Sequence, residues 1–137
     1  EVRGRRIAVL NVLGRVFMPP VDEPFRVADE CVKAIPDDVK IRLVDMHCEA
    51  TSEKYAMGWF LDGRVSCVYG SHTHVQTADE RIFDKGTAYI TDVGMTGSYA
   101  GCIGMKKEDV LQRFMYVPAR RAEHATGDVW ICAIVVE

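Results

Sequence analysis

The chain has 137 residues, of which 48% are hydrophobic and 27% are charged, and its formal net charge is −3. These values are typical of one globular domain, here residues 1–137, and they provide no basic surface for a nucleic-acid backbone. No apolar run approaches the roughly 20 residues that cross a membrane. The five cysteines are odd in number and never form a CxxC pair, which favours a reducing cytoplasm over a disulfide framework or a zinc ribbon.

Apolar runs alternate with amphipathic stretches in the first half of the chain. We predict strands at residues 5–13, 41–46 and 65–69. The first should be buried on both faces, because its apolar residues run almost unbroken instead of alternating. Between each pair of consecutive strands, apolar residues recur at helical spacing. This order of strands and helices predicts an α/β fold with a parallel sheet.

Two helices are predicted between these strands. The first has Asp22 as its N-cap and Pro24 in its first turn, and the second has Thr51 or Ser52 as its N-cap and Gly63 as its C-cap. The residues expected to face the core are Phe25, Ala28, Val32 and Ile35 in the first helix and Tyr55, Ala56, Trp59 and Phe60 in the second.

The second half of the chain is more irregular. Residues 79–83 and 87–91 flank a turn and predict a hairpin, and residues 92–98 form a glycine-containing loop. A short helix is predicted at 107–116 and a final strand at 129–136. The residues expected to face inward here are Val110, Leu111, Phe114, Met115 and Trp130.

Three of the four histidines follow two predicted strands at the point where each strand ends. His47 follows the strand at 41–46, and His72 and His74 follow the strand at 65–69. Ligands and metals bind at this edge of parallel sheets. In extended backbone the i, i+2 spacing puts His72 and His74 on one side, with Thr73 pointing away. Convergence of the three imidazoles predicts a metal site; the alternative is that they are hydrogen-bonded to loop carbonyls.

Several polar residues lie near these histidines in the sequence. Glu49 is a candidate metal ligand, a partner that orients a histidine, or a helix cap, and Asp45 is a similar case. Asp92 follows another strand and is either a supporting residue of the site or a turn former. Two nearby cysteines, Cys48 and Cys67, are expected to pack in the interior. His124 lies in a polar run and is expected at the surface.

The same stretches resemble the YmdB-like branch of the calcineurin-like metallophosphoesterases. The run HxEATSEK at 47–54 and the run GxHTHVQTAD at 70–79 are highly specific. The resemblance covers nearly the whole chain and is carried by residues 11–17, 45–54, 70–79 and 86–97.

This resemblance implies a metallophosphoesterase-like αββα sandwich with two mixed sheets between helices. It also implies phosphodiesterase activity on cyclic nucleotides, including 2',3'-cyclic ones. The expected cofactors are two divalent metal ions, iron or manganese, with zinc as a further option. By resemblance, His47 and His72 ligate one ion and His74 the other, and Glu49, Asp92 and Thr73 are supporting or substrate-side candidates. We assign no catalytic residue within this chain.

One departure from the family pattern is large. Family members carry a preceding segment with an Asp ligand, a Glu-Asn pair and a Gly-Asn-His motif, which this sequence does not contain. The chain also begins without methionine and begins and ends close to strand-like runs. We therefore expect the C-terminal part of a longer enzyme, with weak or no activity alone and a tendency to form homo-oligomers through exposed apolar surface. Two alternatives remain: a non-catalytic metal-binding or interaction fragment, and a mononuclear zinc hydrolase.

Overall fold

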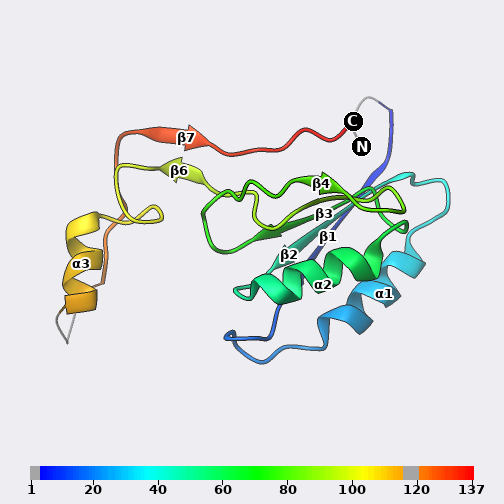
Figure 1. The fold of residues 1–137 in the computed structure, drawn as a ribbon, viewed down its shortest axis with the longest axis horizontal. Coiled ribbons are helices and arrows are strands. Elements are labelled where there is room, and N and C mark those ends of the chain that lie inside the picture. The colour runs from blue at the N-terminus through cyan, green and yellow to red at the C-terminus, as the bar shows by residue number, and fades with distance from the viewer. Residues whose placement is uncertain (1–3, 116–120) are drawn as a thin grey trace.

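The computed structural model describes residues 4–115 and 121–137, and its main body is a five-stranded sheet with the order β1-β2-β3-β5-β4 (Figure 1). The strands are β1 (Ile7–Leu13), β2 (Ile41–His47), β3 (Cys67–Ser71), β4 (Arg81–Ile82) and β5 (Ala88–Ile90). Strands β1, β2, β3 and β5 are parallel, and β4 is antiparallel to β5. The predicted α/β class, the parallel sheet and the hairpin are confirmed.

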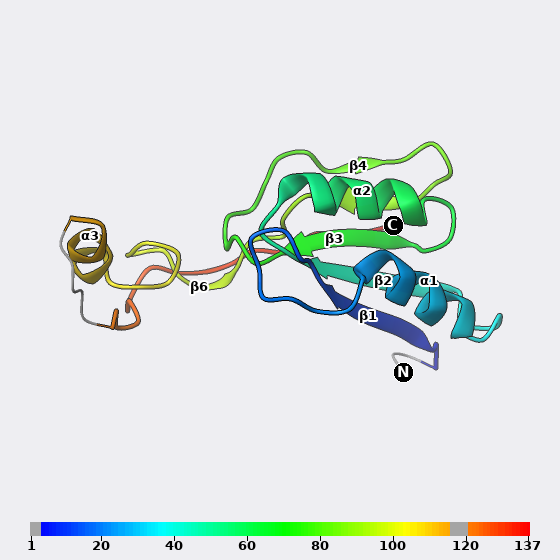
Figure 2. The same cartoon turned by 90° about the horizontal axis from the view of Figure 1, so that it is seen from below.

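Two helices cover one face of this sheet, as the turned view in Figure 2 shows: α1 (Pro24–Ala34) and α2 (Thr51–Leu61). The N-cap of α1 is Glu23 and not Asp22, because the Glu23 carboxylate accepts bonds from the amides of Phe25 and Arg26 at 3.1 and 2.6 Å. The predicted cap of α2 is also wrong, since its N-cap is Ala50, without a side-chain hydrogen bond. The predicted end of α2 at Gly63 is confirmed, because the φ of this glycine is +80°, a conformation common just after the end of a helix.

The buried face of α2 differs from the predicted one. Its buried residues are Lys54, Met57, Gly58 and Leu61, whereas Trp59 and Phe60 are 48% and 40% exposed. Trp59 stacks on Phe83 at the side of the sheet, with ring centroids 4.1 Å apart, and Phe60 meets Phe25 of α1 edge-on at 5.5 Å. These aromatic side chains therefore join α2 to its neighbours and do not enter the core.

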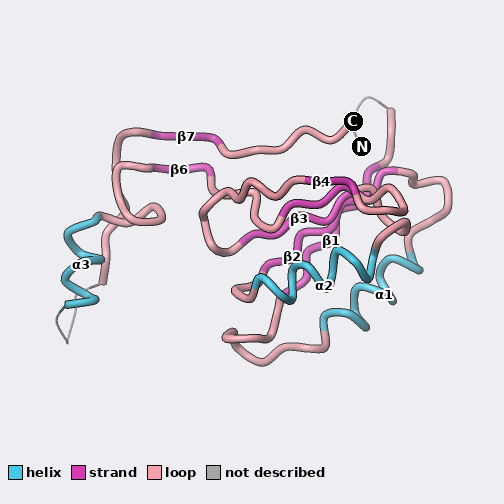
Figure 3. The backbone as a smooth tube through the Cα atoms, in the orientation of Figure 1, coloured by secondary structure: helices cyan, strands magenta, loops and turns pink. Residues whose placement is uncertain are grey.

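Strand β1 is buried on one face only, so the prediction of burial on both faces is wrong. Val12 is buried on the helix side, but Val9 and Leu13 on the other face are 66% and 43% exposed. Further along this face, a cavity of about 970 Å³ separates the sheet from the chain after β7 and is lined by residues that include Leu43, Tyr69 and Ile134. Figure 3 shows that irregular segment running back along the main sheet.

A second, two-stranded sheet of β6 (Thr96–Ser98) and β7 (Val129–Ile131) extends away from the main body and leads to α3 (Lys107–Met115), as Figure 1 shows. Of the four layers of the predicted αββα sandwich, the described residues build one helical layer and one full sheet, and the β6–β7 pair extends away from them. The final strand is shorter than predicted. None of the described helices is long and apolar enough to cross a membrane.

The prediction that the apolar side chains of this extension face inward is wrong. No residue of α3 is buried, and the exposed fractions of Phe114, Met115 and Trp130 are 84%, 65% and 56%. Trp130 stacks on Tyr99, with ring centroids 5.2 Å apart, but it lies outside the core. Tyr116, the last residue of the predicted helix, lies outside the described residues. The apolar positions of this extension therefore remain in contact with solvent.

Candidate metal centre

Two neighbouring strands bring their carboxyl ends together at the candidate site. His47 ends β2 and is paired in register with Ser71, the last residue of β3. A close approach of β1 fixes the same edge, because the Gly14 amide donates to the His47 carbonyl at 2.9 Å. A Cβ atom at Gly14 would lie 2.1 Å from Cβ of Cys48, so only glycine fits there. The fold therefore holds the strand ends rigidly where the histidines begin.

The side chains of His47 and His72 meet at this edge. Nε2 of His47 lies 3.2 Å from Nδ1 of His72, and the rings are nearly perpendicular at 87°. Two nitrogens that each bind one metal ion at 2.0–2.1 Å stand about 3 Å apart. The observed separation therefore fits two ligands of one ion.

Further polar contacts orient these two rings. Nδ1 of His47 lies 2.9 Å from Oγ of Ser71, and that hydroxyl donates to Oδ1 of Asp45 at 2.6 Å. Nε2 of His72 lies 3.1 Å from Oε2 of Glu49. Carboxylates that hold the distal ring nitrogen in this way are typical of metal-binding histidines. Glu49 and Asp45 thus contact the rings or their partners, and Glu49 does not cap α2.

Burial favours the neutral form of His47. Desolvation, followed by repulsion from the His72 ring, lowers the pKa of His47 below its ordinary value of 6.5. A neutral imidazole is the form that binds a metal ion, since its unprotonated nitrogen supplies the lone pair. At neutral pH the His47 side chain is therefore ready to act as a ligand without first losing a proton.

His74 does not join the other two rings, so the prediction that all three imidazoles converge is wrong. Its side chain is exposed, its Nδ1 lies 3.0 Å from the Ile103 carbonyl, and its Nε2 makes no hydrogen bond with the described residues. The backbone is not extended, because φ is +101° at His72 and +66° at His74. In the part of the chain that the structure describes, no group of three or more His, Cys, Asp or Glu is close enough to hold a metal ion.

A buried ion pair supports the loop between the two histidines. Oδ2 of Asp92 accepts bonds from the amide and hydroxyl of Thr73 at 3.1 and 2.7 Å and from Nζ of Lys54 at 2.7 Å. Lys54 and Asp92 are both 1% exposed. Burial opposes ionisation of Asp92, but the bonds from Lys54, Thr73 and the Gly94 amide outweigh it and lower its pKa. Sequence reasoning found Asp92 but missed Lys54, because a lysine is rarely buried.

Asp79 fixes the far end of the same loop and gives a pH-dependent prediction. Burial raises its pKa, but bonds from Thr77 and Thr91 dominate, so the pKa lies below 3.8. A carboxylate with a lowered pKa stabilises the fold above its unfolded pKa, and this contribution is lost as the pH falls through the folded pKa. We expect Asp79→Asn to lower the free energy of unfolding by about 1–2 kcal/mol at pH 7.

Urea denaturation of parent and variant between pH 7 and pH 2 measures this effect. The difference between the two proteins should stay constant down to about pH 4, near the unfolded pKa of aspartate, and shrink below it. A difference that does not change across this range would show that the Asp79 carboxylate is not stabilised in its ionised form.

Other candidate residues do not contact the two rings. Cys48 and Cys67 are buried as predicted, and burial raises the pKa of each thiol to about 11, so neither is a reactive thiolate. His124 is exposed, as predicted.

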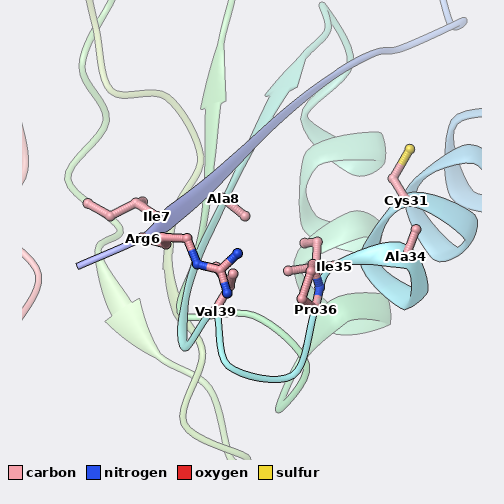
Figure 4. Close-up of a pocket in the computed structure, with 8 residues that line it drawn as sticks. All are labelled: Arg6, Ile7, Ala8, Cys31, Ala34, Ile35, Pro36 and Val39. Atoms are coloured by element: carbon pink, nitrogen blue, oxygen red, sulfur yellow. The ribbon is translucent and has the colours of Figure 1, made fainter. Parts of the chain in front are cut away.

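A shallow pocket of about 550 Å³, drawn in Figure 4, lies where β1 begins and α1 ends. Its lining includes Arg6, paired with Asp38, and Cys31, and it is apolar elsewhere.

Comparisons with known proteins identify relatives of this chain. The chain is 48% identical over its whole length to a Bacillus subtilis protein named 2',3'-cyclic-nucleotide 2'-phosphodiesterase and covers 52% of it. A crystal structure of a hypothetical protein from Thermus thermophilus superposes with a TM-score of 0.88 at 44% identity, over 94% of this chain and 50% of that one.

A Mycoplasma pneumoniae protein described as a novel phosphatase has a TM-score of 0.75 at 38% identity, over 85% of this chain and 42% of that one. The chain thus spans about half the length of these relatives. The model of one family, described as YmdB-like protein, matches residues 1–137. Since that match covers the whole sequence, the chain belongs to the YmdB-like protein family.

Proposed function

We propose that this chain supplies part of the dinuclear metal centre of a phosphodiesterase that hydrolyses 2',3'-cyclic nucleotides. The observation that carries the proposal is the 3.2 Å separation of the His47 and His72 nitrogens, with the outer nitrogen of each ring held by a polar partner. The name of the Bacillus subtilis relative supports the substrate class. The proposed metals are the ones that the family resemblance implies, iron or manganese, with zinc as a further option.

Each candidate residue has a distinct role in this proposal. His47 and His72 hold one ion, and His74 holds the other through its Nε2. Glu49 orients His72, and Asp92 orients the loop through Thr73. When bound, a metal pair supplies a water of lowered pKa and positive charge for the phosphate. No group of this chain is assigned as the general acid for the leaving oxygen.

The proposed site needs ligands from a further segment. Three neutral imidazoles cannot offset the four positive charges of two divalent ions, and carboxylates usually do so. An N-terminal segment of the same polypeptide, or a second polypeptide, is the proposed source of the remaining ligands.

The exposed apolar side chains of β1 and α3 also support homo-oligomer formation in a cytoplasmic protein. A non-catalytic metal-binding fragment is the alternative, favoured by the separation of His74 from the other two rings.

Metal binding by single-residue variants tests the proposal. We expect the 137-residue chain to bind at most one Mn²⁺ tightly enough to measure by calorimetry. His47→Ala and His72→Ala should each weaken this binding by about tenfold or more, because each removes a direct ligand. His124→Ala, at an exposed position, is the matched control and should bind Mn²⁺ as the parent does.

Hydrolysis of 2',3'-cyclic AMP in the presence of Mn²⁺ separates the two candidate functions. The chain alone should show weak or no turnover, and turnover should appear when a polypeptide with the remaining ligands is added. His72→Ala should abolish that gain, whereas His124→Ala should not. Mn²⁺ binding without any such gain would favour the non-catalytic alternative, and equal binding by parent and His47→Ala would contradict the proposed ligands.

A further inference from the structure

The loop from His72 to His74 has an unfavourable backbone conformation on both sides of Thr73. With φ values of +101° and +66°, both histidines occupy a region that residues with a side chain adopt rarely. Such conformations persist only where the surrounding structure fixes them, and they cluster at functional sites. A specific set of contacts must therefore hold Thr73, and those contacts also decide where the two imidazoles point.

Asp92 supplies these contacts. One carboxylate oxygen, Oδ2, accepts from both the amide and the hydroxyl of Thr73, and the other, Oδ1, accepts from the Gly94 amide at 2.8 Å. The amide bond fixes the backbone at the residue between the histidines, and the hydroxyl bond fixes its side chain. A buried carboxylate is costly to keep ionised unless a cation lies beside it. The Thr73 contacts therefore depend on the group that balances the charge of Asp92.

Lys54 is that group, and it comes from a different layer of the fold. It lies in the first turn of α2, on the helical face of the sheet, and its Nζ reaches Oδ2 of Asp92 at 2.7 Å. Its aliphatic chain passes Gly70 of β3 so closely that a Cβ atom at Gly70 would lie 2.6 Å from Cδ of Lys54. The lysine thus connects the helical layer with the loop that carries His72 and His74, although it contacts neither ring.

We infer that Lys54 is a positioning residue of the metal centre: through Asp92 and Thr73 it holds His72 and His74 in the orientation that binds metal. The inference rests on the proposed function where it names a metal ion as the ligand. The part that concerns the conformation of the loop from His72 to His74 does not depend on that function. Arginine is expected to be a poor substitute, because its planar guanidinium is larger than the ammonium group that fits beside Gly70.

Two pairs of variants test the inference, with Mn²⁺ as the probe and circular dichroism to establish the temperature at which each protein is folded. Lys54→Met removes the charge, and Leu61→Ala, in the core at the other end of α2, is its control for lost stability. Thr73→Val removes the hydroxyl bond with little change in shape, and Thr73→Ser keeps it. The Thr73 pair provides the test if Lys54→Met does not fold.

Lys54→Met and Thr73→Val should weaken Mn²⁺ binding by about tenfold or more and speed hydrogen exchange at the amide of residue 73. Leu61→Ala and Thr73→Ser should bind as the parent does. Parental Mn²⁺ affinity and exchange in folded Thr73→Val would overturn the inference. If the parent itself binds no Mn²⁺, the proposed metal site fails; faster exchange in the variants then still supports the positioning role, and unchanged exchange overturns it.

Discussion

Replacing Lys54 by methionine is expected to lower the free energy of unfolding by about 3–5 kcal/mol, because it leaves the buried Asp92 carboxylate without its cation. Both side chains are 1% exposed, so water cannot replace the lost partner. Methionine follows the same aliphatic path through the core, and the loss therefore reports the charge and not the volume of the side chain. Urea denaturation followed by circular dichroism measures the change at neutral pH.

A double variant separates the unpaired charge from the loss of the pair. Lys54→Met combined with Asp92→Asn should be less destabilised than Lys54→Met alone, since no buried charge remains and the asparagine carbonyl still accepts from Thr73. Lys33→Met is the surface control, because Lys33 is 71% exposed and should change stability by about 0.5 kcal/mol or less. A loss below about 1 kcal/mol for Lys54→Met would show that the ion pair is not needed for folding.

The arrangement of the main sheet could be predicted because it follows from local patterns. Apolar runs at residues 41–46 and 65–69 identify strands that are buried on the helix side, and the helical spacing between them requires a parallel connection. Adjacent parallel strands end at the same edge, which brings His47 and His72 together. The meeting of these two rings is therefore a consequence of fold class and could be predicted without a structure.

The fine geometry of the site could not be predicted, because it depends on contacts between distant residues. Lys54 and Asp92 are 38 positions apart in the sequence, and nothing near Lys54 marks it as buried. The periodicity of α2 therefore suggested a different inward face. The left-handed backbone at His72 and His74 has a similar origin, since it is held by hydrogen bonds from outside the loop. The expectation of extended backbone there was wrong.

The helix α3 shows a further limit of sequence patterns. Its apolar residues recur at helical spacing and predict one apolar face, but the pattern does not say what covers that face. In the structure Phe114 remains 84% exposed, and Val9 of β1 is 66% exposed on the uncovered side of the sheet. The sequence patterns correctly predicted the helix and the strand. They did not show which segments would pack on them, so the predicted burial of these side chains was wrong.

Replacing Gly70 by alanine is expected to lower the free energy of unfolding by about 4 kcal/mol or more and to abolish Mn²⁺ binding. A Cβ atom at this position would lie 1.7 Å from the Thr91 carbonyl oxygen and 2.6 Å from Cδ of Lys54. The first contact is with backbone, so no change of rotamer relieves it. The Gly70 carbonyl also accepts from the Val93 amide at 2.9 Å, and separation of these segments would move Asp92 away from Thr73.

Gly97→Ala is the matched control for this change. Gly97 lies in β6, and among the described residues a Cβ atom there would have only the Met95 sulfur within 4.0 Å. Stability should therefore change by about 0.5 kcal/mol or less. Urea denaturation and Mn²⁺ calorimetry of both variants give the comparison. If Gly70→Ala were as stable as Gly97→Ala, the close contact between β3 and the chain after β5 would not exist in solution. The path of the Lys54 side chain to Asp92 would then have to differ as well, because this path and the contact between the two segments each require glycine at residue 70.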